Sequence, residues 1–213
     1  MLPVLRDKFN THERDRQHPF DLYQEVSYDV SMKKVLVVLA EGSEELEAVS
    51  IIDVLRRAKA RLDVVSVGDL EVTCSKGLRL SCEKRIEEVI DEEYDLIAIP
   101  GGMPGAQNLS ASAPFIGLLR RHLQRGGLVG AICAAPAVVL EPLRATSGKR
   151  VTCHPAFRHL LKAGTYDDSP VVVDGNLITG KGAGHAIAFA LRLLETLFDP
   201  ETVEEVKSGM TLL

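Results

Sequence analysis

Short runs of aliphatic and β-branched residues alternate with longer amphipathic segments from Lys34 to the end of the chain. Continuous apolar runs of this length are typical of strands that are buried on both faces of a mainly parallel sheet. The alternation therefore predicts an α/β sandwich. The predicted strands are Val35–Leu39, Val64–Val67, Leu96–Ile99, Leu128–Ile132, Val171–Val173 and Leu177–Thr179.

The segments between these runs have the apolar spacing of helices that pack one face against a sheet. With 213 residues and 46% hydrophobic content, the chain is long enough for one well-buried domain, which we place at residues 33–213. The predicted helices are Glu44–Ala58, Ile86–Asp91, Pro114–Gln124, Ala135–Leu143, Ala156–Lys162, His185–Leu197 and Glu201–Ser208.

Charge and hydropathy limit the classes of partner. The formal net charge is -5 and no basic cluster occurs, which argues against stable binding of nucleic acid or of an anionic membrane. No stretch approaches the roughly 20 apolar residues that span a bilayer. Small molecules or protein surfaces are the expected partners.

The four cysteines, Cys74, Cys82, Cys133 and Cys153, are too few and too scattered for a disulfide scaffold in a chain of this length. They indicate a reducing compartment, and we expect the cytoplasm. A zinc site is not expected, because no close-spaced pairs of ligands accompany Cys153 and His154.

Residues 1–32 differ in composition from the rest of the chain. Basic and acidic residues interleave there without a central apolar stretch, so neither a secretory signal nor a transit peptide is predicted. We interpret this segment as an amino-terminal appendage, partly disordered, which is absent if synthesis begins at Met32. The sequence assigns it no function.

Chemically suggestive residues follow several of the predicted strands. In open parallel sheets, ligands bind in the crevice beyond the carboxyl ends of the strands. We therefore expect these residues to meet at one edge of the sheet. They are Glu41–Glu47 after the first strand, Pro100–Gly102 after the third, Cys133 after the fourth, and later His154–Pro155 and Gly180–Gly184.

Cys133 lies between a predicted strand and a predicted helix, with Gly130, Ala131, Ala134 and Ala135 around it. Such small residues permit a sharp strand-to-helix elbow that exposes its central side chain. Free N–H groups and the positive dipole at a helix amino terminus favour thiolate over thiol. We predict a nucleophile that is ionised at neutral pH; a buried structural cysteine is the alternative.

Glu47 heads the apolar stripe Ile51, Val54 and Ala58, which must face the sheet. A carboxylate in that position is costly unless it is hydrogen-bonded or protonated. The Cys133 sulfur would meet this need, so we predict that Glu47 is the acid/base group. The ordinary alternative is a solvated acid in the first helical turn.

Gly101 and Gly102 are compatible with a tight turn and also with close approach of their N–H groups to a reacting atom. Together with the N–H of Ala134, they would stabilise an oxyanion. His154 would orient the thiolate or bind substrate, and a surface histidine is an equal alternative. The glycine loop Gly180–Gly184 lacks the spacing of a nucleotide-binding motif, so nucleotide binding is not expected.

Four segments carry a family resemblance, in order along the chain from about Lys33 to its end. They are Ala40–Glu47, Pro100–Gly102 with Gly105–Leu109, Ala131–Pro136, and Thr152–Pro155. This motif set closely resembles the ThiJ/PfpI superfamily and, within it, the branch of the parkinsonism-associated protein deglycase.

The resemblance implies a flavodoxin-like three-layer α/β sandwich with a mainly parallel sheet, a homodimer, and no cofactor. It implies that Cys133 is the nucleophile, that Glu47 shares a hydrogen bond with it, that Gly102 and Ala134 are backbone donors, and that His154 lies nearby. The dimer would form through the first helix and the hairpin region Cys74–Lys76.

The implied activity is glutathione-independent conversion of methylglyoxal to lactate, or of glyoxal to glycolate, and removal of early glyoxal adducts from proteins and nucleotides. A linked role in oxidative stress is also implied. The alternative is a redox sensor or chaperone whose Cys133 is oxidised to a sulfinate. A catalytically silent interaction module with a structural cysteine is the third hypothesis.

The chain also departs from related patterns. Ala134 replaces the histidine that follows the cysteine in the protease-like branch, and no His-x-Glu pair of an amidotransferase follows. Peptide hydrolysis and amide transfer are therefore disfavoured. In the last glycine loop, Lys181 and Ala183 stand where the branch that the chain resembles commonly has arginine and proline. Because lysine is a point charge and not a planar fork, bidentate recognition of an anion is not expected there.

Overall fold

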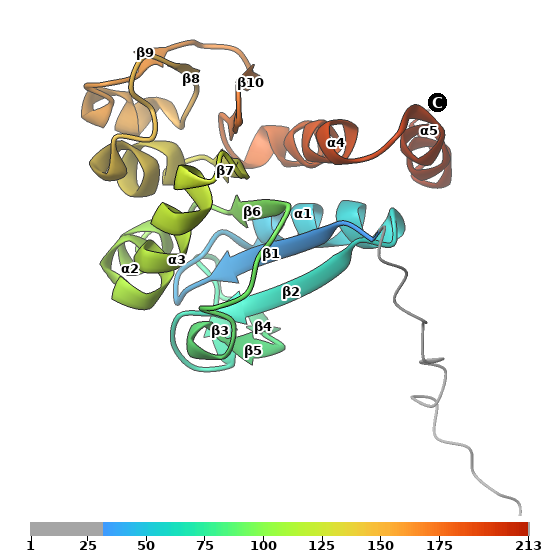
Figure 1. The fold of residues 1–213 in the computed structure, drawn as a ribbon, viewed down its shortest axis with the longest axis horizontal. Helices are drawn as coiled ribbons and strands as arrows, with labels where there is room; N and C mark the ends of the chain where they lie inside the picture. The colour runs from blue at the N-terminus through green and yellow to red at the C-terminus, as the bar shows by residue number, and fades with distance from the viewer. Residues whose placement is uncertain (1–31, 213) are drawn as a thin grey trace, which may run out of the picture. The chain divides into compact units, whose positions relative to one another are not determined.

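A seven-stranded sheet forms the centre of the computed structural model, which describes residues 32–212 (Figure 1). Every pair of neighbouring strands is parallel except β10 and β11. The strands are, in spatial order, β10 (Val171–Asp174), β11 (Leu177–Gly180), β7 (Leu128–Ile132), β6 (Leu96–Ile99), β1 (Lys34–Leu39), β2 (Arg61–Ser66) and β5 (Lys84–Arg85). The predicted α/β fold with a mainly parallel sheet is confirmed.

Helices cover both faces of this sheet (Figure 1). Along β1, Val35 and Val37 pack into the core of one face, whereas Leu36 and Val38 pack into the core of the other. Burial on both faces explains why the strand has a continuous apolar sequence. The helices of the first face are α1 (Glu45–Arg57), α4 (Ala186–Leu197) and α5 (Pro200–Gly209), and those of the second are α2 (Gly105–Ala111) and α3 (Ala113–Gln124).

Helix α1 positions the acid of the candidate site. It begins at Glu44, whose side chain accepts a hydrogen bond from the N–H of Glu47 at 2.8 Å. Ile51, Val54 and Leu55 are buried on its inner face, and burial of each such side chain stabilises the fold by about 1.5–3 kcal/mol. This stripe fixes the rotation of the helix, and with it the direction of Glu47.

Several predicted helices are shorter or of another type. The segment predicted at Ile86–Asp91 forms a single 3-10 turn, Ile86–Glu88, and Pro155–Leu160 is also a 3-10 helix. The helix predicted at Ala135–Leu143 is a π-helical turn, Pro136–Leu140, followed by a 3-10 turn, Glu141–Leu143. Pro142 lies within the predicted helix and lacks an N–H, so it cannot continue an α-helical ladder.

Four short strands lie outside the main sheet. The sequence indicated a hairpin around Cys74–Lys76 but gave no bounds for these strands. They are β3 (Glu71–Thr73) with β4 (Arg79–Ser81), which form a hairpin, and β8 (Arg150–Val151) with β9 (Thr165–Tyr166). The hairpin turns Val72, Cys74 and Cys82 into the core on the α1 side. Cys74 and Cys82 therefore act as small buried hydrophobes.

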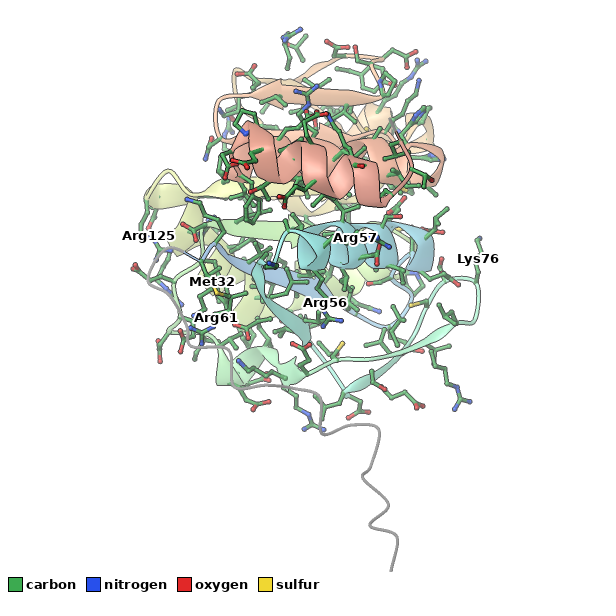
Figure 2. The ribbon with its side chains drawn as sticks, turned by 90° about the vertical axis from the view of Figure 1, so that its right-hand side faces the viewer. Met32, Arg56, Arg57, Arg61, Lys76 and Arg125 are labelled. Carbon is green, nitrogen blue, oxygen red and sulfur yellow. The ribbon has the colours of Figure 1, made fainter. Side chains whose placement is uncertain are left out.

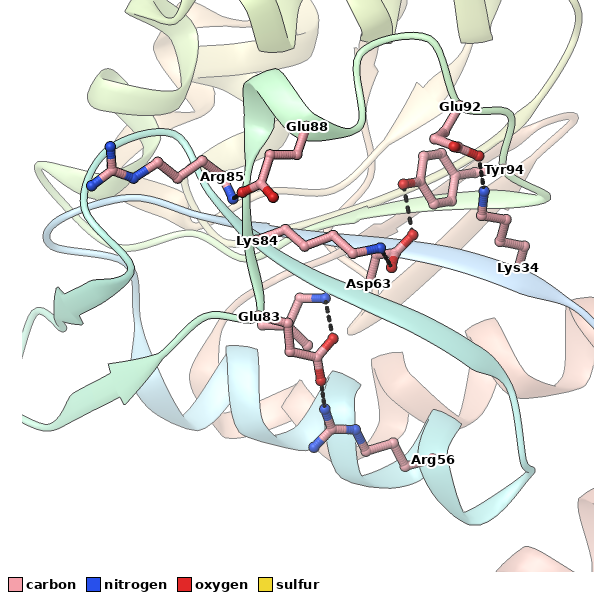
Figure 3. Close-up of polar contacts among 10 residues, drawn as sticks. Lys34, Arg56, Asp63, Glu83, Lys84, Arg85, Glu88, Glu92 and Tyr94 are labelled. Atoms are coloured by element: carbon pink, nitrogen blue, oxygen red, sulfur yellow. Dashed lines mark hydrogen bonds and ion pairs between the residues drawn. The ribbon is translucent and has the colours of Figure 1, made fainter. Parts of the chain in front are cut away.

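A buried polar network joins strands near their amino ends (Figure 3). Asp63 of β2 is only 5% exposed and accepts hydrogen bonds from Tyr94 Oη at 2.8 Å and Lys84 Nζ at 2.6 Å. Lys34 pairs with Glu92 and lies 4.7 Å from the centre of the Tyr94 ring. These contacts fix β5 and the segment before β6 to the sheet.

The predicted appendage, residues 1–32, lies outside the described residues except for Met32. Within residues 32–212, no helix has both the length and the apolar character needed to cross a bilayer.

Candidate active site

The connections after β1, β6, β7 and β11 surround a cavity of about 540 Å³ at the carboxyl edge of the sheet. This is the edge at which the sequence predicted the functional residues to meet. The lining residues are Glu44, Glu47, Ser75, Lys76, Gly102, Met103, Cys133, Ala134, His154, Pro155, Phe157 and Lys181–His185.

Cys133 occupies a strained elbow directly after β7. Its φ is +63°, a backbone conformation that residues other than glycine seldom adopt. Its N–H donates to the Gly180 carbonyl at 2.9 Å, and its own carbonyl accepts from the His154 N–H at 2.8 Å. Ala134 is fully buried behind it, whereas Cys133 stays partly exposed to the cavity. The predicted elbow is confirmed.

The glycines after β6 allow the backbone to approach this elbow. A Cβ on Gly101 would lie 2.6 Å from the Cys133 Cβ and 2.9 Å from the Ala134 nitrogen, closer than such atoms can pack. Gly102 has a φ of +87°. A side chain at position 101 would therefore push the strand connection away from the sulfur.

Glu47 is fully buried beside Cys133, as its place on the apolar stripe predicted. Its Oε2 accepts a hydrogen bond from the Gly101 N–H at 2.8 Å. Its Oε1 is buried without a well-formed hydrogen bond from any residue between 32 and 212. Burial, with a smaller contribution from the charge of Glu44, raises the pKa of Glu47 to about 7.

The thiol does not have the low pKa that the sequence suggested. Burial, followed by the negative charge of Glu47, raises the pKa of Cys133 to about 12, while the N–H groups of Gly102 and Ala134 act in the opposite direction. The prediction of a thiolate at neutral pH is therefore wrong for the state in which Glu47 is ionised. The elbow amides are present, but two acids that share a buried site cannot both be ionised cheaply.

The thiol and the carboxyl consequently behave as one unit. At pH values between about 7 and about 12, the pair holds one proton and one negative charge. Oε1 of Glu47 has no competing donor, so it is free to take the proton from the sulfur. A carboxylate with a pKa near the working pH is well matched to act as a general base.

The structure leaves two of the three predicted oxyanion donors available. The N–H of Gly101 is engaged by Glu47, so Gly101 holds the carboxyl group and is not available as the predicted oxyanion donor. The N–H groups of Gly102 and Ala134 are directed at the Cys133 sulfur. Oxyanion stabilisation stays a prediction for these two residues.

His154 lines the cavity, but no hydrogen bond joins its ring to Cys133 in the described part of the chain. The Nδ1 atom accepts the N–H of Ala156 at 3.2 Å, and the ring packs edge-on against Phe157 at 5.9 Å between centroids. Orientation of the sulfur by this ring is not supported. Instead, the backbone N–H of His154 holds the elbow carbonyl.

The glycine-rich loop after β11, residues Lys181–Gly184, also lines the cavity. Lys181 Nζ lies 3.0 Å from an Asp168 carboxylate oxygen and 3.1 Å from the Asp168 carbonyl, so its charge is already paired. Within residues 32–212, no group of three or more His, Cys, Asp or Glu side chains is placed to hold a metal ion.

Sequence reasoning did not assign four of the lining residues to the site: Ser75, Lys76, Met103 and Phe157. Met103 directly follows the predicted glycine pair, and Phe157 follows His154 by three residues. Ser75 and Lys76 lie in the turn of the hairpin that the sequence indicated around Cys74–Lys76, but the sequence placed this hairpin at the dimer interface and not at the cavity.

Comparison with known proteins agrees with this arrangement. Residues 33–196 match the model of the DJ-1/PfpI family. Protein DJ-1 homolog B of Arabidopsis thaliana is 41% identical over 79% of this chain and 39% of its own length, so the chain spans about two-fifths of that relative. The glutathione-independent glyoxalase DJR-1.2 of Caenorhabditis elegans is 37% identical over 85% of this chain and 98% of its own.

A solved structure of Toxoplasma gondii DJ-1, in an oxidized form, has a TM-score of 0.81 and 42% identity to this chain. The match covers 84% of this chain and 98% of that one. The fold and the family resemblance are therefore both confirmed.

The raised pKa of Glu47 predicts a pH-dependent effect of Glu47→Gln on stability. The folded state binds more protons than the unfolded state between pH 4.5 and about 7, so ionisation of Glu47 destabilises the fold as the pH rises through this range. Above pH 7, the variant should be more stable than the wild type by up to about 3 kcal/mol, and the difference should vanish near pH 4.5.

Urea unfolding at pH 4.5 and pH 8 measures this difference. Glu71→Gln, which removes a surface carboxylate, is the control and should show little dependence on pH. A gain in stability that is equal at both pH values would contradict the assignment of the raised pKa to Glu47.

Proposed function

Because the chain belongs to the DJ-1/PfpI family, we propose that it is a glutathione-independent glyoxalase that converts methylglyoxal to lactate through Cys133 and Glu47. The observation that carries the proposal is the contact between a cysteine on a strained elbow and a buried carboxyl group with one free oxygen. The Caenorhabditis elegans relative that is named a glutathione-independent glyoxalase also supports the proposal.

In the first step, the Cys133 sulfur bonds to the aldehyde carbon while ionised Glu47 takes the thiol proton onto Oε1. The aldehyde oxygen gains negative charge next to the N–H groups of Gly102 and Ala134, which stabilise it. Glu47 then returns the proton to this oxygen. The result is a hemithioacetal, with Glu47 again ionised.

In the second step, Glu47 removes the hydrogen of the former aldehyde carbon as a proton and delivers a proton to the neighbouring ketone carbon. The hydroxyl proton of the hemithioacetal passes to the former ketone oxygen, so a thioester carbonyl forms at the first carbon and a hydroxyl group at the second. The aldehyde carbon is oxidised and the ketone carbon is reduced within one molecule, so no redox cofactor is needed. The product is a lactoyl thioester of Cys133. Water cleaves the carbon–sulfur bond and releases lactate and the thiol.

The same chemistry supports a wider substrate range. Glyoxal would give glycolate, and the carbinol adducts that these aldehydes form on proteins or nucleotides would react at the same carbon, which would make the protein a deglycase. All four cysteines are unpaired, which supports a cytoplasmic location.

We also propose a homodimer through α1 and the β3–β4 hairpin. Leu46 and Val49 on α1 are 53% and 42% exposed, and Leu78 in the hairpin is 49% exposed. Large apolar side chains clustered on a surface are typical of protein interfaces.

Lactate formation from methylglyoxal without glutathione tests the enzyme assignment. Cys133→Ala should abolish it, and Glu47→Gln should lower kcat by about 100- to 10,000-fold, because the variant cannot accept a proton. Cys82→Ala removes a buried sulfur of the hairpin and is the control that should retain activity. Unchanged rates in the first two variants would exclude this mechanism.

A redox sensor is the second candidate function. Of the four cysteines, only Cys133 is partly exposed, whereas Cys74, Cys82 and Cys153 are at most 7% exposed. The related Toxoplasma gondii structure is of an oxidized form. Sulfinate at Cys133 would accept hydrogen bonds from the elbow N–H groups and from protonated Glu47.

Mild peroxide treatment followed by peptide mass spectrometry tests this second role. Two oxygen atoms should be added at Cys133 before any other cysteine reacts. Oxidation spread evenly over the four cysteines would argue against selective sensing.

A further inference from the structure

A closed cycle of three hydrogen bonds joins Glu44, Gly101 and Glu47. The Glu44 N–H donates to the Gly101 carbonyl at 3.0 Å, and the Gly101 N–H donates to Glu47 Oε2 at 2.8 Å. The Glu47 N–H in turn donates to a Glu44 carboxylate oxygen at 2.8 Å. Glu44 therefore holds the residue that binds the reacting carboxyl group, and its side chain caps the helix that carries this group.

The same cycle fixes the peptide group that faces the sulfur. The Gly101 carbonyl and the Gly102 N–H belong to one planar trans peptide and point in opposite directions. Glu44 binds this carbonyl, and the N–H is directed at Cys133. A Cβ on Gly102 would lie 2.5 Å from the Glu44 nitrogen, so the two backbones are in close contact. Glu44 thus orients a donor to the sulfur as well as the acid beside it.

The Glu44 carboxylate also places a second negative charge near the reacting pair. It lines the cavity from a half-buried position, and it forms no ion pair with any residue from 32 to 212. A like charge disfavours ionisation of a neighbouring acid. Burial is the main cause of the raised pKa of Glu47, and the charge of Glu44 adds to it.

The other charged side chains of α1 are placed differently from Glu44. Glu45 is directed to the hairpin, where its carboxylate accepts the Lys76 N–H at 2.9 Å. Arg56 and Arg57 lie in the last turn of the helix, about three turns from Glu44 (Figure 2). Of the charges on this helix, that of Glu44 is the one beside Glu47 that acts on its carboxyl group.

Other elements contribute four further titratable side chains to the cavity wall. They are Lys76 of the hairpin, His154, Lys181 and His185. Lys181 is already paired with Asp168 at 3.0 Å. Among the titratable groups of residues 32–212, Glu44 and Cys133 are the ones that act on the Glu47 carboxyl group.

We propose that Glu44 is a positioning residue of this active site. Its N–H aligns the Gly101–Gly102 peptide toward the sulfur, and its carboxylate places a negative charge beside the proton that Glu47 and Cys133 share. The proposal rests on the function proposed above, in which Glu47 is the base for Cys133. The charge of Glu44 keeps Glu47 protonated at low pH and makes it a stronger base once it is ionised. Glu44 therefore restricts the reactivity of Cys133 to neutral and higher pH.

Glu44→Gln tests the role of the charge. The amide has the same length as the carboxylate and still accepts the Glu47 N–H, so the cap is kept. Alkylation of Cys133 by iodoacetamide should be about two- to fivefold faster than in the wild type at pH 6, because Glu47 ionises more readily without the neighbouring charge. At pH 8 the alkylation should be slower than in the wild type, because ionised Glu47 is then a weaker base. The two pH profiles should therefore cross.

Two further variants separate the charge from the cap. Glu44→Asn is neutral and supplies another side chain that caps helices well, so it should shift the profile in the same direction as Glu44→Gln. Glu45→Gln removes a charge from the same turn of α1, keeps an acceptor for the hairpin, and should leave the wild-type profile unchanged. Either neutral variant of Glu44 that is folded, as measured by urea unfolding, suffices for the test. A wild-type profile in that variant, or an equal shift in Glu45→Gln, would overturn the proposal.

Failure of the glyoxalase assignment has a different signature, because alkylation needs no aldehyde. If the wild type forms no lactate from methylglyoxal, the alkylation profiles still decide the role of Glu44. If lactate is formed, the pH profile of kcat/KM reports the same pair in the free enzyme, and its acidic limb should move to lower pH in Glu44→Gln. An acidic limb that stays at the wild-type position would refute the role of the charge.

Discussion

The contact between the Glu47 carboxyl group and the Cys133 sulfur is the interaction on which the rest of the site depends. Both groups are acids in a poorly solvated position, so only one of them is readily ionised. The single proton of the pair makes the thiol dependent on its neighbour. Reactivity therefore belongs to the pair and not to a cysteine with a low pKa of its own.

The fold brings Glu47 and Cys133 together from two distant parts of the chain and holds the Cys133 backbone in a strained conformation. The apolar stripe of α1 directs Glu47 inward, and the turn after β7 holds Cys133 at a φ of +63°. Gly101 serves both groups, because its missing side chain admits the elbow and its N–H binds the carboxylate. The burial that fixes this geometry is also what raises both pKa values, so packing and acid–base chemistry have the same origin.

Local sequence pattern predicted the strands that are buried on both faces, such as β1 and β7, and it placed Glu47 four residues before Ile51 on the inner face of α1. It did not predict that β2 begins at Arg61, because Asp63 is accommodated there only by the distant Tyr94 and Lys84. The pKa of Cys133 was mispredicted for a related reason: burial and the charge of Glu47 are properties of the assembled site. The same holds for Lys76, which reaches the cavity through a hairpin clamped by Glu45.

The pH dependence of Cys133 alkylation by iodoacetamide, in the wild type and in Glu47→Gln, tests the shared proton most directly. The account predicts a midpoint near pH 7 in the wild type, where ionised Glu47 becomes available to take the thiol proton. In Glu47→Gln the midpoint should move above pH 9, because burial still raises the pKa of the thiol and no base assists it. The same midpoint in both proteins would contradict the account.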